Sequence, residues 1–298
     1  MEVHFDRGTM RTEEKRGCKK FMETNLNRFL TLPRFLNLNY RRPLTTMIMK
    51  RFISIMAMML LASGIMYADE IWRDETLRYA MYLGPIKAGE ASLATKNIEY
   101  NGQKMVQMDL IARTTSAVEK IFSLNDTLTT IVSPANSAPV YFQKHCFEGD
   151  DIVREKVNFT NESDGRCTAA MQKIYKNGRV KDCLETSETQ VYDMVSVVGF
   201  ARSIDAGSLS KGKRFNFKLA DACDIIDEVL IYQGKESLKI SGKKYNCMVF
   251  RLVEPYEEKG KKKERDILTI YVNDDSERTI VQMDIKFKVG SAKAKIIR

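Results

Sequence analysis

The sequence predicts a mainly β fold, in which a single antiparallel meander closes into a β-barrel; a β-sandwich is the alternative. Three observations support this prediction: apolar and polar residues alternate along several segments, glycine-containing turn dipeptides separate those segments, and one segment only has helical periodicity. Short strands joined by tight turns form an antiparallel meander, which must close or stack in order to bury its apolar face.

The clearest strand signal lies near the end of the chain. Apolar residues alternate with polar ones at Val281, Met283, Ile285, Phe287 and Val289. This period of two places the apolar side chains on one face of a strand. Because the apolar residues here include large ones, such a strand fills a barrel interior rather than leaving it empty.

Turn dipeptides predict hairpins between the strands. Asn101-Gly102 separates residues 91–100 from 103–111, and Asn177-Gly178 separates residues 168–175 from 180–184. Both dipeptides suit the positive φ angles that a type I′ turn requires.

The helical segment lies around residues 189–203. Its apolar residues follow an amphipathic stripe at Val191, Met194, Val195 and Val198, and residues 187–190 (Ser-Glu-Thr-Gln) fit a capping box at its start. We expect this helix to plug one barrel mouth or to pack on one face of the sheet.

The N-terminal part contains a predicted secretory signal peptide at residues 49–68. Met49, Lys50 and Arg51 precede a charge-free, mostly apolar run at residues 52–66, and we expect cleavage between Ala68 and Asp69. An uncleaved membrane anchor is the alternative, but a spanning helix needs about 20 predominantly apolar residues. Residues 69–298 then form one β-barrel domain in the periplasm or outside the cell.

Residues 1–48 precede the predicted signal peptide, although such signals normally begin a chain. We interpret them as a disordered extension that results from a start codon assigned too early, so that Met47 or Met49 replaces Met1 as the first residue. A basic cytoplasmic extension on an anchored protein is the other interpretation.

The net charge of +9 does not indicate a nucleic-acid-binding protein. Residues 1–68 carry 12 basic and 5 acidic side chains, whereas the remaining residues carry 36 and 34. A nucleic-acid-binding domain would be expected to have a clustered basic face in its folded part.

Five cysteines follow the predicted signal peptide, and they bear on disulfides rather than on metal binding. They are Cys146, Cys167, Cys183, Cys223 and Cys247. An exported protein can form one or two disulfides from them, and the odd number leaves at least one free thiol or an intermolecular bond. Since no Cys-x-x-Cys pair occurs, neither a redox motif nor a zinc site is indicated. The sequence leaves the pairing open.

No catalytic constellation emerges, so we expect no enzymatic activity, cofactor or metal. His145 is the only histidine after the signal peptide. Its neighbour Cys146 could form a catalytic dyad, but adjacent side chains on a strand point to opposite faces. The acidic residues Asp221, Asp224 and Asp227, with Glu228, lack the spacing of a calcium loop and are interpreted as a solvated connector.

One dense basic run lies between two predicted strands. It contains Lys259, Lys261, Lys262, Lys263 and Arg265, interspersed with glutamates. We interpret it as a solvated hairpin tip; the alternative is contact with lipid phosphates or an anionic envelope glycan.

Four segments resemble the exported bacterial family called domain of unknown function 3108. They are YAMYLGPIKAGEA at 79–91, DMVS at 193–196 with Arg202, GKKYNCMVF at 242–250 and LTIYVNDD at 268–275. The resemblance covers nearly all of residues 69–298. It implies an envelope protein with a largely antiparallel β-barrel, most familiar from Gram-negative bacteria, and it implies no catalytic residues.

Two function classes follow from these observations. The first is a non-enzymatic protein that binds a lipid, glycolipid or other amphiphile within or at the mouth of the barrel. The second is a structural or assembly partner in envelope biogenesis, which acts on an envelope protein through its outer surface or a strand edge. Neither requires more than peripheral membrane contact, and the sequence does not give the oligomeric state.

Overall fold

The computed structural model describes residues 71–119, 123–148, 151–286 and 290–297. The predicted extension at 1–48, the signal peptide at 49–68 and the cleavage site at Ala68 and Asp69 lie outside these residues.

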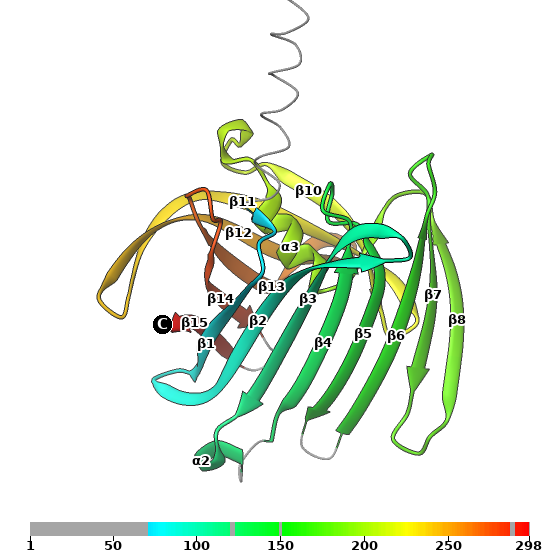
Figure 1. Cartoon of the computed structure of the whole chain (residues 1–298), viewed down its shortest axis with the longest axis horizontal. Helices are drawn as coiled ribbons and strands as arrows, with labels where there is room; N and C mark the ends of the chain where they lie inside the picture. The colour runs from blue at the N-terminus through cyan, green and yellow to red at the C-terminus, as the bar shows by residue number, and fades with distance from the viewer. Residues whose placement is uncertain (1–70, 120–122, 149–150, 287–289, 298) are drawn as a thin grey trace, which may run out of the picture. The chain divides into compact units, whose positions relative to one another are not determined.

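The described residues form one large sheet of fifteen strands, which curls into a nearly closed barrel (Figure 1). The strands are β1 Glu75–Leu83, β2 Ile86–Tyr100, β3 Gln103–Thr114, β4 Asn125–Val132, β5 Pro139–Glu148, β6 Asp151–Asn161, β7 Cys167–Ile174, β8 Val180–Ser187, β9 Val191–Tyr192, β10 Arg214–Asp221, β11 Asp224–Ile240, β12 Lys243–Glu258, β13 Lys261–Asn273, β14 Ile280–Lys286 and β15 Ser291–Ile297. Three short helical segments accompany them: α2 Ser116–Glu119, α3 Ser196–Ser203 and the 3₁₀ turn η1 Ala206–Ser208. The predicted mainly β fold is therefore confirmed.

The order of the strands explains how the barrel closes. Pairing runs from β8 back to β1, passes to β15, and continues down to β9. Neighbouring strands are antiparallel, except that β9 pairs with β10 in parallel. The edges β8 and β9 are thus consecutive in the chain, and no backbone ladder joins them within the described residues. We call the line where these two edges meet the seam.

Contacts between side chains hold the seam together. A disulfide links Cys183 on β8 to Cys223 in the turn between β10 and β11, with a Cα–Cα distance of 5.6 Å. Gln190 Nε2 donates a hydrogen bond to Asn161 Oδ1 at 2.8 Å near the other end of β8. The barrel is therefore closed at the seam by a covalent bond and polar contacts instead of a ladder.

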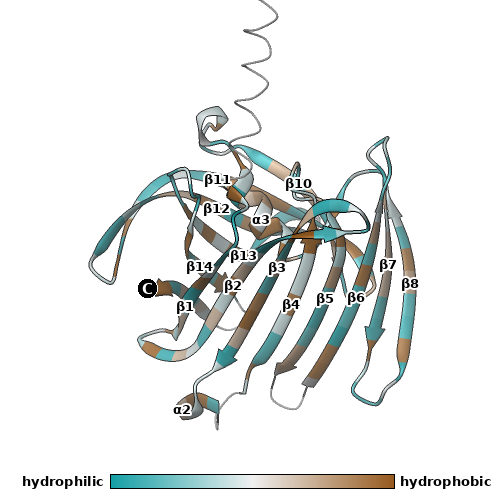
Figure 2. Cartoon of the chain, viewed as in Figure 1, coloured by the Kyte–Doolittle hydropathy of each residue, from teal (hydrophilic) through white to brown (hydrophobic). Residues whose placement is uncertain are grey.

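Alternating hydropathy along the strands separates the two faces of the sheet (Figure 2). On β3, for example, Val106 and Met108 belong to the main apolar core, whereas the intervening Gln107 faces the other way. The prediction for residues 281–289 is correct at Met283, which belongs to the main core, but wrong at Val281. A bulge opposite β13 places Val281 in a separate small cluster, so that Ile280 belongs to the main core instead. Phe287 and Val289 lie outside the described residues.

Helix α3 lies inside the curved sheet and contacts β4 and β13 (Figure 1). It starts later than predicted, since Val191 and Tyr192 form β9 and the first helical residue is Ser196. The reason is Asp193, whose Oδ1 accepts hydrogen bonds from the backbone N–H groups of Val195 and Ser196 at 2.8 and 2.9 Å. The predicted capping box is therefore wrong: Ser187 Oγ accepts a hydrogen bond from the N–H of Thr189 in a local turn instead.

Three buried contacts fix α3 in one half of the barrel. Arg202 is 1% exposed, forms an ion pair with Glu75 on β1, and donates to the carbonyl oxygen of Glu277 at 3.0 Å. Asp193 Oδ2 accepts a hydrogen bond from Thr130 Oγ1 on β4 at 2.7 Å. At Gly199, an added Cβ would lie 2.7 Å from Met108 Cε, so the glycine allows a close approach between helix and sheet. These contacts confirm that the helix fills the barrel from within.

The turns follow the predictions in part. Asn101 and Gly102 have φ angles of 51° and 76°, as a type I′ turn requires. Of the second pair only Gly178 has a positive φ; Asn177 Oδ1 instead accepts a hydrogen bond from the N–H of Arg179 at 3.1 Å.

The positive φ angles in the turn that contains Cys223 lead us to expect that a glycine substitution there stabilises the fold. Ala222 and Cys223 have φ angles of 49° and 82°, a conformation that costs L-residues with a Cβ about 1 kcal/mol each. We expect Ala222→Gly to raise the free energy of unfolding by about 1 kcal/mol, measured by chemical denaturation. Ala170→Gly, at an exposed position of β7, serves as the control and should lower it by a similar amount. Equal effects of the two substitutions would contradict the assignment of strain to this turn.

Candidate functional site

The two halves of the barrel interior differ in how well they are filled. Around α3 the inward-facing side chains are almost fully buried, as with Tyr79, Phe142 and Phe250, which are at most 1% exposed. Farther along β1 and β3, away from α3, inward-facing Met81 and Leu110 are only half-buried. We call this second region the open half.

The walls of the open half contain apolar side chains from several strands. Ala112 on β3, Val153 on β6 and Leu268 on β13 share the inward face with Leu110, and all are half-buried. Their partial exposure leaves apolar surface of these side chains in contact with solvent, although Leu93 and Leu128, the register partners of Leu110, are buried.

Charged side chains line the same region close to the seam. Glu155 on β6, 6% exposed, lies between two ammonium groups, Lys144 Nζ at 3.9 Å and Lys173 Nζ at 3.8 Å. Lys144 Nζ also lies 3.9 Å from Asp221 Oδ1, on the opposite side of the seam. The open half thus combines apolar walls with a chain of charges.

Glu228 extends this chain of charges along β11. It pairs in register with Phe217 on β10, which is buried in the core, and it is only 4% exposed. Its Oε2 atom has no hydrogen-bond partner among the described residues. Burial, followed by repulsion from Glu254 and Asp221, raises the pKa of Glu228 to about 7.

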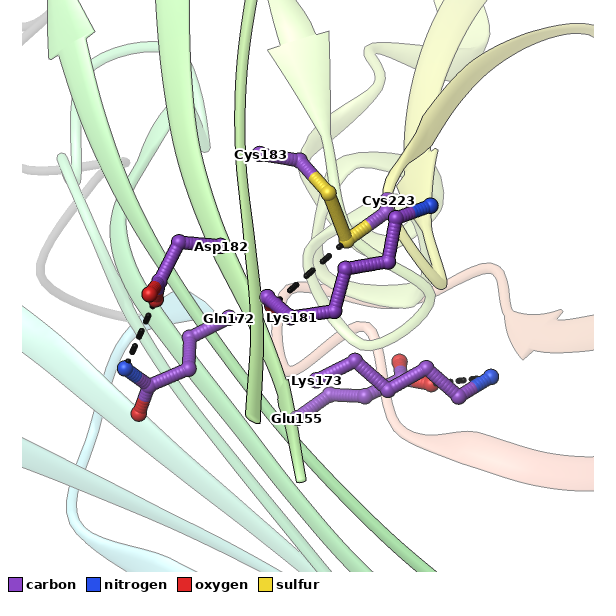
Figure 3. Close-up of a disulfide and its surroundings, with 7 residues drawn as sticks. All are labelled: Glu155, Gln172, Lys173, Lys181, Asp182, Cys183 and Cys223. Atoms are coloured by element: carbon purple, nitrogen blue, oxygen red, sulfur yellow. Dashed lines mark hydrogen bonds and ion pairs between the residues drawn. A yellow bond between two sulfur atoms is a disulfide. The ribbon is translucent and has the colours of Figure 1, made fainter. Parts of the chain in front are cut away.

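The disulfide lies beside these charges (Figure 3). Figure 3 shows Lys173 and Glu155 on the side of the sheet that faces Cys223, whereas Gln172 and Asp182 lie on the opposite side and are hydrogen-bonded at 2.9 Å. The bond between Cys183 and Cys223 therefore lies on the inner side, next to the charged residues.

The other predicted cysteine sites, Cys146, Cys167 and Cys247, are buried, and none of them takes part in the disulfide. Burial raises the pKa of Cys167, and it raises that of Cys247 to about 12, which is the opposite of what a reactive thiolate needs. His145 and Cys146 lie on opposite faces of β5, and the imidazole Nε2 of His145 is 2.9 Å from Gln143 Nε2. The structure does not bring these residues together as a dyad.

The predicted basic run forms the exposed tip of the β12–β13 hairpin. Lys259 and Gly260 occupy the turn, and Lys261 and Lys262 pair in register with Glu258 and Glu257. Lys263 forms an ion pair with Glu258, and Arg265 Nε donates to Glu254 Oε2 at 3.1 Å. These cross-strand pairs balance much of the positive charge, and contact with an anionic surface stays a prediction.

The acidic cluster at 221–228 is where the sequence interpretation was wrong. Asp224 to Glu228 begin β11 rather than a solvated connector, and Glu228 faces the interior. Strand alternation from Glu228 through Leu230 and Tyr232 could have indicated this orientation. No group of three or more His, Cys, Asp or Glu side chains in the described part of the chain could hold a metal ion.

Two hollows flank the seam on the surface of the described domain. One, of about 460 Å³, is lined by Met171, Cys183 and Leu184 along β7 and β8. The other, of about 500 Å³, lies at the edge of β10 against Phe200 and Phe217. No helix among the described residues is long and apolar enough to cross a membrane.

The raised pKa of Glu228 predicts a pH-dependent stability. A carboxyl group with a folded-state pKa of about 7 and an ordinary value of 4.5 stabilises the fold fully below pH 4.5, and this contribution is lost as the pH rises through 7. The difference corresponds to roughly 3 kcal/mol. We expect Glu228→Gln to raise the free energy of unfolding at pH 8 by about 2–3 kcal/mol and to have little effect at pH 4.5.

Urea denaturation between pH 4.5 and 8 measures this effect. Asp227→Asn, at the neighbouring exposed position, is the control and should follow the parent protein. If the free energy of unfolding depended on pH in the same way for the parent protein and the Glu228→Gln variant, the side chain of Glu228 would not be buried as described.

Comparisons with known proteins give a family but no activity. No curated protein matches the chain. Among solved structures, one described as a β-barrel-like protein of domain of unknown function DUF1849 from Brucella abortus matches with 11% identity and a TM-score of 0.49, over 75% of this chain and 95% of that one. The family model described as "Protein of unknown function (DUF3108)" matches residues 78–297, which confirms the resemblance seen in the sequence, and the chain belongs to this family.

Proposed function

We propose that the protein is an exported, non-enzymatic binding protein that holds a lipid or another amphiphile in the open half of its barrel. One observation carries the proposal: several inward-facing apolar side chains of this half, among them Leu110, Ala112 and Leu268, stay partly exposed, whereas Tyr79, Phe142 and Phe250 near α3 are almost fully buried. Apolar surface inside a barrel is shielded from water only when something else occupies the space.

The size of the barrel supports this proposal. Eight strands give an interior that side chains can fill or that holds one small ligand, and wider barrels leave more room. Within the curve of this fifteen-stranded sheet, helix α3 contacts β4 and β13. An amphiphile would place its apolar part against Leu110, Ala112 and Leu268 and its polar group near Lys144 and Glu155.

Two features support export. The run at residues 52–66 resembles a signal peptide. The disulfide between Cys183 and Cys223 belongs to an oxidising compartment, because cytosolic thiols are kept reduced.

A second function is favoured by a separate observation. On the outer face of the edge strand β8, Val180 and Leu184 are 47% and 70% exposed. An edge strand that lacks a ladder partner on one side and has exposed apolar residues can receive a strand from another protein. The alternative is therefore an assembly partner in the cell envelope that binds another envelope protein at β8.

Amphiphile binding predicts different effects for two neighbouring residues of β3. Leu110 faces the interior and Ile111 faces outward. With the neutral fluorescent amphiphile N-phenyl-1-naphthylamine as the probe, we expect Leu110→Lys to weaken binding at least about tenfold, since a lost leucine contact is worth about 1.5 kcal/mol or more. Ile111→Lys, the matched control, should bind like the parent protein.

Fluorescence titration and circular dichroism of all three proteins decide the outcome. Equal affinities for the two folded variants, or no binding to the parent protein, would rule out the interior site. If a substitution of Leu184, and no other substitution, abolishes binding of a protein partner, the assembly role is favoured.

Export predicts the chemical form of the protein in its native cells. We expect the purified chain to begin at Asp69 and to retain the Cys183–Cys223 disulfide, so that alkylation modifies only three cysteines after denaturation. Intact mass and N-terminal sequencing measure both properties. A chain that starts well before residue 69, or five alkylated cysteines after residue 68, would contradict export.

A further inference from the structure

We propose that Glu228 receives a primary ammonium group on the headgroup of the bound molecule. This inference rests on the proposed function and adds the chemical class of the ligand: an amphiphile with an amine next to its apolar part.

The first argument is the state of the carboxyl group. Glu228 is 4% exposed, and the residues on the same face of β11 point into the barrel. Its Oε2 atom is buried and has no hydrogen-bond partner in the described chain. A buried carboxyl oxygen without a partner costs free energy, so its retention calls for a donor that is not part of the described chain.

The second argument is that the neighbouring carboxyl groups already have cations. Asp221, on the paired strand β10, faces Lys144 Nζ at 3.9 Å. Glu254, on β12 at the other side of β11, accepts from Arg265 Nε at 3.1 Å. Across the seam, Glu155 has both Lys144 and Lys173. Among these four carboxyl groups, Glu228 is the one for which the described residues provide no cation.

The third argument concerns the kind of cation. The described residues contain no cluster with enough ligands for a metal ion. A primary ammonium needs fewer fixed ligands, because it is a compact charge with three donors. The half-buried apolar residue Ile226, two positions from Glu228 on the same face, offers a surface for the adjoining apolar part of the ligand.

Charge regulation at the site is consistent with such a ligand. Glu254 and Asp221 repel a charge on Glu228, and burial disfavours it, so that its pKa lies at about 7. An arriving ammonium stabilises the carboxylate. At pH 7 about half of the Glu228 carboxyls carry a proton, and binding transfers that proton to solvent as the ion pair forms.

Decylamine and decanol, used below their aggregation concentrations, test the inference on the whole protein. They share the apolar chain and differ in the polar group. By calorimetric titration at pH 7, we expect the parent protein to bind decylamine at least about tenfold more tightly than decanol. Glu228→Gln should reduce this preference to about twofold or less and leave decanol affinity unchanged.

Asp227→Asn is the matched control, because it removes a neighbouring carboxylate that is exposed on the outer face. It should keep the full preference for decylamine. Titrations in buffers of different ionisation enthalpy give a second readout. At pH 7, decylamine binding should release about half a proton per site in the parent protein and none in Glu228→Gln, which a merely structural role for Glu228 would not produce.

The outcomes separate this inference from the proposed function. Equal affinities of the parent protein for the two probes, or an undiminished preference in Glu228→Gln, would overturn the ammonium site while leaving amphiphile binding intact. A parent protein that binds neither probe would overturn the proposed function itself. Circular dichroism checks that the variants are folded. We expect the Glu228→Gln variant to fold, because this substitution should raise the free energy of unfolding.

Discussion

The structure depends on filling one half of a wide barrel with a segment of its own chain. Side chains alone fill the interior of a narrow barrel, but fifteen strands enclose more space than that. Helix α3 solves this problem because two polar residues are buried with it: Arg202 pairs with Glu75, and Asp193 both caps the helix and binds Thr130. Without Glu75 the buried guanidinium of Arg202 would lose its counter-ion, and without Thr130 the buried carboxyl of Asp193 would lose one of its hydrogen bonds. Such losses in the interior cost more than the contacts themselves stabilise.

The placement of α3 also determines where the ladder of paired strands is interrupted. The polypeptide leaves β8, enters the interior through β9 and α3, and returns along β10. The two edges that result cannot form a ladder with each other along their length, since β9 has only two residues. The disulfide between Cys183 and Cys223 compensates for this missing ladder, and it does so from a turn whose residues adopt positive φ angles at some cost.

Much of the fold was predictable from local sequence patterns, because strand alternation and turn dipeptides are local properties. The positive φ angles at Asn101 and Gly102 are an example. The start of α3 was not predictable in this way. Asp193 and Ser187 could each cap the helix, and only the burial of Asp193 against Thr130 decides between them. The cysteine pairing was not predictable either, because it depends on which edges meet at the seam. For the site, the sequence showed acidic residues at 221–228 but not their orientation, which depends on whether the segment forms a turn or a strand.

The charges of the open half are arranged in a way that stability alone does not explain. An aliphatic residue in place of Glu228 would pack beside Phe217 without the cost of desolvating a carboxyl group. The chain instead places an acidic group there, between two other carboxyl groups, while every neighbouring carboxyl has a cation from the protein. Groups that weaken a fold in this way cluster at sites of function, where a ligand provides the missing partner. Partly exposed apolar walls and a carboxyl group without its cation are thus two parts of one incomplete environment, and an amphiphile with an amine would complete both.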